Sequence, residues 1–82
     1  MDFRFWEFEH EVIVEAPDSE MKRLDQLAAN LADGWGWGIE FDSDTTMRYR
    51  FQHIRDALMF AIRCKVKVVS APERYWSLGK KD

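Results

Sequence analysis

Cysteine, proline and long apolar runs are all scarce in this chain of 82 residues. The one cysteine, Cys64, excludes a disulfide within the chain and is typical of a protein from a reducing compartment. No apolar stretch approaches the ~18 residues that cross a bilayer, and no basic start followed by an apolar run marks a signal peptide. We therefore expect a cytoplasmic protein without a membrane segment.

A basic surplus is missing too, because 12 lysines and arginines stand against 15 aspartates and glutamates, for a net charge of −3. No overall positive field draws such a chain to phosphate backbones, which argues against nucleic-acid partners. Two histidines and one cysteine give no metal-ligand spacing, so we expect neither metal nor cofactor. No nucleophile has an identifiable base and orienting group, so no catalytic residue is assigned and the balance favours a protein that is not an enzyme.

What the chain does have is an alternation of acidic and apolar residues from Glu7 to Glu15. This period of two is typical of a strand with one dry face and one wet face. The expected strand spans residues 3–16 and ends at Pro17, which cannot continue a ladder. Thr46–Gln52 and Lys65–Ser70 alternate in the same way with cations in place of the acids, and so predict two further strands.

Two other segments have the three- and four-residue apolar spacing of amphipathic helices. The first begins after Asp18 or Ser19, either of which can cap it, and ends at Gly34, where a left-handed residue normally stops a helix. The second spans His53–Cys64. Trp35–Phe41, which follows the first helix directly, predicts one more strand, with its aromatic and apolar residues on one face.

The resulting β-α-β-β-α-β order predicts an α+β, ferredoxin-like domain over residues 1–70, followed by a polar C-terminal tail over residues 71–82. In that arrangement the antiparallel strand order is 4-1-3-2 and both helices lie on one face, because crossovers are right-handed. Alternation then places the acids of the first strand and the cations of the third and fourth on the opposite face. The side chains expected there are Glu9, Glu11, Glu15, Arg48, Arg50, Lys65 and Lys67.

Aromatic residues make up 15% of the chain, more rings than so small a core buries completely. Interface cores are enriched in such residues, and the Trp35–Phe41 strand is expected at a sheet edge without a protective lysine or proline. We predict a small non-enzymatic protein-binding or regulatory module that forms a homodimer or docks on another protein. The residues expected at this interface are Phe3, Phe5, Trp35, Trp37, Tyr75 and Trp76.

One alternative is a small enzyme or ligand-sensing domain with a pocket near His10 or His53, although a lone histidine is more often structural.

A second alternative is nucleic-acid binding, because Arg48-Tyr49-Arg50-Phe51 resembles the third strand of RNA recognition motifs. That resemblance implies bases stacked on outward aromatics and an RNA partner, with Arg48 and Arg50 as the binding cations. The glycine positions of that family hold arginines here, and the alternation turns Tyr49 and Phe51 toward the helices.

Overall fold

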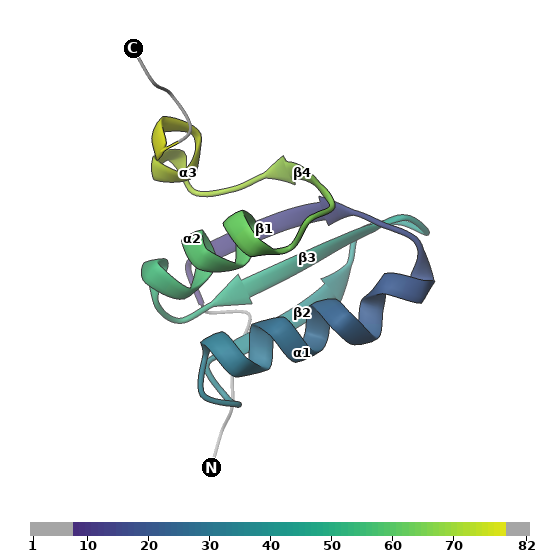
Figure 1. The fold of residues 1–82 in the computed structure, drawn as a ribbon, viewed down its shortest axis with the longest axis horizontal. Helices are drawn as coiled ribbons and strands as arrows, with labels where there is room; N and C mark the ends of the chain where they lie inside the picture. Colours follow the sequence, from purple (N-terminus) through teal and green to yellow (C-terminus); the bar gives the residue numbers. More distant parts are fainter. Residues whose placement is uncertain (1–7, 79–82) are drawn as a thin grey trace.

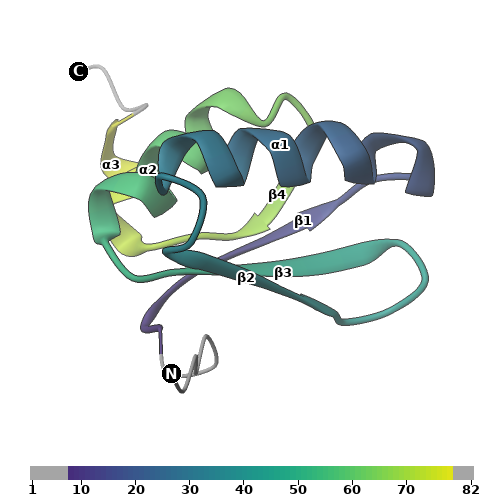
Figure 2. The same cartoon turned by 90° about the horizontal axis from the view of Figure 1, so that it is seen from below.

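The computed structural model describes residues 8–78. In chain order the elements are β1 (His10–Glu15), a 3₁₀ turn η2 (Asp18–Glu20), α1 (Met21–Leu31), β2 (Trp37–Phe41), β3 (Thr46–Phe51), α2 (Ile54–Arg63), β4 (Lys67–Ser70) and α3 (Glu73–Leu78). The strands form one antiparallel sheet, and the two longer helices cover one of its faces (Figures 1 and 2). The α+β class and the four-stranded antiparallel sheet predicted from the sequence are confirmed.

The strand order is β2-β3-β1-β4, which read from the β4 edge is 4-1-3-2. The strand with the acidic alternation, β1, therefore lies inside the sheet, with β3 on one side and β4 on the other. Its register with β3 places Val12 opposite Tyr49, and the register between β2 and β3 places Ile39 opposite the same tyrosine. The register of the pairing between β1 and β4 shifts between Ile13 and Val14.

The core lies between the sheet and the two longer helices. Tyr49, Phe51 and Phe60 are fully buried, and the Phe60 ring centroid lies 4.6 Å from that of Tyr49 and 5.3 Å from that of Phe51. Burying each large apolar side chain stabilises the fold by about 1.5–3 kcal/mol. The smaller side chains packed around these rings include Val12, Val14, Leu24, Ala28, Met47, Ala57, Ala61 and Cys64.

Two polar contacts fix α1 over the sheet and against α2. The Tyr49 hydroxyl donates a 2.6 Å hydrogen bond to Oδ1 of Asp25 on α1. Burial, this hydrogen bond and the nearby carboxylate together raise the pKa of the Tyr49 phenol far above its ordinary value. Arg23, also on α1, donates a 2.6 Å hydrogen bond to the carbonyl of Cys64, the residue that follows α2. This bond satisfies a carbonyl at the helix end that has no partner within the helix.

Both ends of α1 differ from the sequence prediction, and the helix ends at Leu31, three residues before Gly34. Neither Asp18 nor Ser19 caps the helix with its side chain, because both belong to the 3₁₀ turn η2, which leads directly into α1. The left-handed residue predicted at the helix end is confirmed, since Gly34 has φ 87° and donates a 2.7 Å hydrogen bond to the carbonyl of Ala29. Asp33 before it is left-handed as well, with φ 55°.

Residues 73–78, within the predicted C-terminal tail, form a helix, α3, that the sequence pattern did not predict. Tyr75 of this helix packs against the core. The fourth strand is shorter than predicted, because Lys65 has φ 57° and lies in the connection that leads to β4. Within the described residues the first strand begins at His10, and the part of it predicted over residues 3–7 lies outside them.

Candidate functional site

Cations and carboxylates alternate across the sheet face opposite the helices. Nη2 of Arg50 lies 3.5 Å from Glu11 on β1, while its Nε lies 2.9 Å from Glu40 on β2. Arg48 lies 3.0 Å from Asp42 and 4.0 Å from Glu11. On the other side of β1, Lys67 lies 3.5 Å from Glu15. The predicted opposition of the β1 acids to the cations of the neighbouring strands is thus confirmed at these positions.

Sequence reasoning missed Glu40 and Asp42 as members of this set. The sequence contained the information for Glu40, because this residue alternates with Trp37 and Ile39 and therefore faces away from the helices. Both β3 arginines therefore have carboxylates on two sides. The aromatic residues that an RNA recognition motif would present lie on the other side of the strand, where Tyr49 and Phe51 are fully buried.

The β2 strand forms one edge of the sheet, and half of its backbone groups point away from the sheet. The N–H of Gln52 donates to the carbonyl of Gly36, and the N–H of Asp42 donates to the carbonyl of Thr46, both at 3.0 Å. In an antiparallel ladder the residues that bond to the neighbour alternate with residues that point away from it. Between these two bonds, Gly38 and Glu40 therefore face β3, and the N–H and C=O groups of Trp37, Ile39 and Phe41 point outward.

The side chains of these three outward residues lie on the helix-bearing face. Trp37 stacks on Tyr49 with ring centroids 6.1 Å apart, and Ile39 packs against the core as well. Phe41 at the end of the strand is 63% exposed, although the sequence alternation places it on the same face as Trp37 and Ile39. Unlike Trp37 and Ile39, it is not among the residues that pack against the core. We call the outward backbone groups of Trp37, Ile39 and Phe41, with their side chains, the β2 edge.

The predicted interface residues that lie within the described part of the chain do not gather into one patch. Trp35 lies in the turn before β2 and is 59% exposed, while Trp37 is half-buried. Tyr75 and Trp76 lie on α3. This helix follows β4, the strand at the edge of the sheet opposite β2 (Figure 1). Their rings form an edge-to-face pair with centroids 4.9 Å apart, and Trp76 remains exposed. Phe3 and Phe5 lie outside the described residues.

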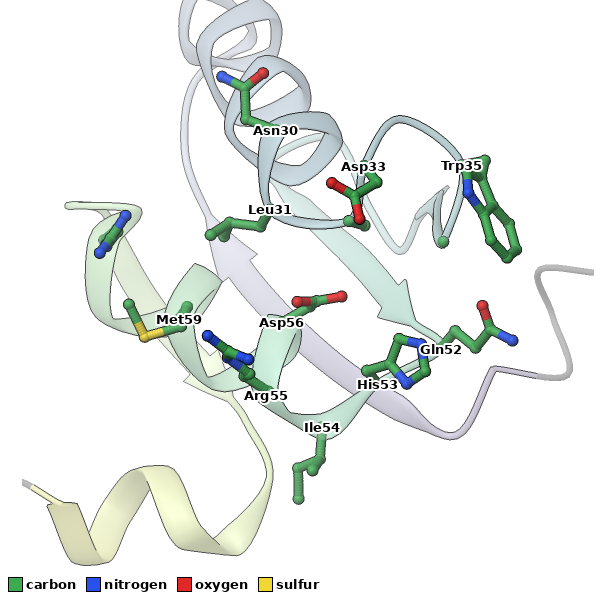
Figure 3. Close-up of a pocket in the computed structure, with 13 residues that line it drawn as sticks. Asn30, Leu31, Asp33, Trp35, Gln52, His53, Ile54, Arg55, Asp56 and Met59 are labelled. Atoms are coloured by element: carbon green, nitrogen blue, oxygen red, sulfur yellow. The ribbon is translucent and has the colours of Figure 1, made fainter.

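A cleft of about 780 Å³ lies between the end of α1 and the start of α2. Figure 3 shows the carboxylates of Asp33 and Asp56 turned toward the space between these elements, with His53 beside Gln52. Of the two histidines considered from the sequence, His53 lines this cleft and His10 does not. The remaining lining side chains include both charged and apolar groups, namely Asn30, Leu31, Trp35, Ile54, Arg55, Met59 and Arg63.

The cleft has polar groups but no assembled catalytic group. Within residues 8–78, the side chains of Asp33, His53 and Asp56 form no hydrogen bond or ion pair with one another. A general base held by an orienting carboxylate is therefore not formed there. In the same part of the chain no three histidine, cysteine or acidic side chains come close enough together to hold a metal ion.

Comparison with known proteins adds no functional assignment. No protein family, curated protein or solved structure matches this chain. None of the helices in the described part has the length and apolar character required to cross a bilayer.

Proposed function

We propose that this protein is a small non-enzymatic protein-binding module whose working surface is the β2 edge. The observation that carries the proposal is the row of outward N–H and C=O groups on Trp37, Ile39 and Phe41, next to an exposed aromatic side chain. Such an edge binds an extended segment of another chain as an additional strand, with backbone hydrogen bonds for affinity and side-chain contacts for selectivity.

The way this edge differs from a protected one supports the proposal. Proteins usually protect an edge with lysine, proline or an inward charge. The β4 edge carries Lys67, whereas β2 has neither lysine nor proline and its single charge, Glu40, is held by Arg50 on the opposite face. The β-α-β-β-α-β order and the position of β1 between β3 and β4 further support a ferredoxin-like assignment, in which β2 is an edge strand.

Selection from a library of random extended peptides tests this function. The protein is immobilised at low density, so that copies of the chain cannot pair on the surface. We expect enriched peptides whose binding shifts the amide resonances of Trp37, Ile39 and Phe41. Phe41→Lys should lose those peptides, while Ile62→Lys, at an exposed apolar residue of α2, should keep them. Absence of enrichment, or shifts confined to another surface, would contradict the proposal.

The cleft favours a second candidate function, the binding of a small polar ligand. Its volume of about 780 Å³ falls within the range of small-molecule sites, and its lining supplies charges of both signs from two elements. Titration with a defined mixture of zwitterionic and anionic small molecules tests it. Shifts confined to Asp33, His53 and Asp56 would support a ligand site, and an unchanged spectrum would remove it.

A further inference from the structure

We infer that the partner of the β2 edge is a second copy of this chain, paired antiparallel about a two-fold axis at Ile39. This inference rests on the proposed function and specifies its partner. The outward residues Trp37, Ile39 and Phe41 are spaced symmetrically about Ile39. A two-fold axis at that residue places Ile39 opposite its own copy and Trp37 opposite Phe41 of the other chain. Each of these pairs then exchanges two backbone hydrogen bonds, which would join the two sheets into one.

The side chains on the helix-bearing face complement one another in this register. Phe41 is 63% exposed in the single chain, and Trp37 is half-buried. Directly opposed side chains in an antiparallel pair have Cβ atoms about 4.5–5.5 Å apart, and aromatic pairs contribute roughly 0.2–1 kcal/mol. The axis repeats each contact, so two such aromatic pairs flank the central isoleucine pair. The register thereby covers the large apolar side chain that the single chain leaves most exposed among residues 8–78.

The side chains on the sheet face opposite the helices are also compatible with this pairing. In the same register Glu40 lies opposite Gly38 of the other chain, so the carboxylate meets a residue without a side chain. The charge of Glu40 is matched within its own chain, because the carboxylate lies 2.9 Å from Nε of Arg50. The two Glu40 residues therefore approach as neutralised pairs. A strand that is complementary to itself in both size and charge is what an interface with two-fold symmetry requires.

Sedimentation equilibrium between about 1 and 100 µM tests for the dimer. We expect a reversible monomer–dimer equilibrium that Phe41→Lys weakens at least about tenfold, because the substitution acts twice across the axis. Ile62→Lys is the matched control, since Ile62 is similarly exposed but lies on α2, and should leave the association unchanged. A strict monomer over this range overturns the inference. The proposed function would then still stand if the peptide selection places a ligand on the β2 edge.

Cysteine cross-linking tests the register independently of affinity. Residues that face each other in a hydrogen-bonded pair have Cα atoms about 5.5 Å apart, within the range that a disulfide spans. Ile39→Cys should therefore cross-link to itself under mild oxidation. Phe41→Cys should not, because its copy lies about 13 Å away along the strand. Buried Cys64 is common to both variants and does not affect the comparison. A dimer in which Phe41→Cys cross-links and Ile39→Cys does not, or in which neither does, would overturn the inference.

Discussion

The hydroxyl of Tyr49 in the middle of β3 donates a 2.6 Å hydrogen bond to the carboxylate of Asp25 on α1. Tyr49 is fully buried and has β1 on one side and β2 on the other. Its ring also lies against Phe60 of α2 and Trp37 of β2. One side chain thus connects the three strands nearest the β2 edge with both longer helices, so the position of that edge depends on it.

Tyr49→Phe should lower the free energy of unfolding by about 1.5–3 kcal/mol, because it removes a hydrogen bond to a charged acceptor and leaves that carboxylate without its donor. Urea unfolding followed by circular dichroism measures the change. Tyr75→Phe on α3 provides the control and should change stability by less than about 0.5 kcal/mol. Equal effects of the two substitutions would show that the Asp25 contact contributes nothing specific.

Stability should fall at high pH in a way that depends on Tyr49. Burial, the hydrogen bond and the charge of Asp25 raise the pKa of this phenol in the folded protein, while the unfolded chain loses the proton near its ordinary pKa of about 10. The folded state therefore holds the proton more tightly. The contribution of protonated Tyr49 to the free energy of unfolding is fully present below about pH 10 and is lost as the pH rises above it. Unfolding of the wild type and Tyr49→Phe at a series of pH values isolates the effect. Parallel pH profiles would contradict it.

The two glycines before β2 should respond in opposite directions to alanine. Gly34 has φ 87° and an added Cβ would meet no atom within 4 Å, so the cost of Gly34→Ala is purely conformational, about 1–2 kcal/mol. Gly36 has no positive φ, and its added Cβ would make ordinary contacts of 3.5 Å with Ala32. Gly36→Ala should therefore be neutral or stabilise by up to about 1 kcal/mol, because it restricts the unfolded chain. Thermal unfolding of both variants measures the two changes in stability. Equal losses of stability would contradict this prediction.

Single-stranded RNA should not bind through β3. The cations of Arg48 and Arg50 lie within 3.5 Å of Asp42, Glu11 and Glu40, and the neighbouring aromatics are buried. Fluorescence anisotropy with a labelled oligonucleotide at about 50 mM salt should show no association. Arg48→Glu combined with Arg50→Glu should leave that result unchanged. Tight binding that this double variant abolishes would revive the RNA-recognition interpretation.

Particular residues show how far the sequence could predict the site. The alternation around Val12 and Val14 was enough to identify β1. The element order then predicted that β1 and β3 are neighbours, and the opposed charges of Glu11 and Arg50 agree with that placement. The aromatic surplus led us to predict an interface, but the exposure of each aromatic side chain did not follow from the sequence. Trp37 and Tyr75 pack against the core, whereas Phe41, which was predicted on the same face as Trp37, is largely exposed. Alternation predicts the face of a strand that a side chain takes, but not whether another element covers that position.

By itself the sequence determined the number of strands and their order along the chain, the two longer helices, and which charged side chains of a strand share a face. These features follow from local periodicity, because one buried face imposes its spacing on the chain. Only the tertiary structure decided that residues 73–78 form a helix, that Tyr49 bonds to Asp25, and which backbone groups of β2 point outward. Each of these depends on which segments distant in sequence come together in the fold, and local periodicity carries no information about such contacts.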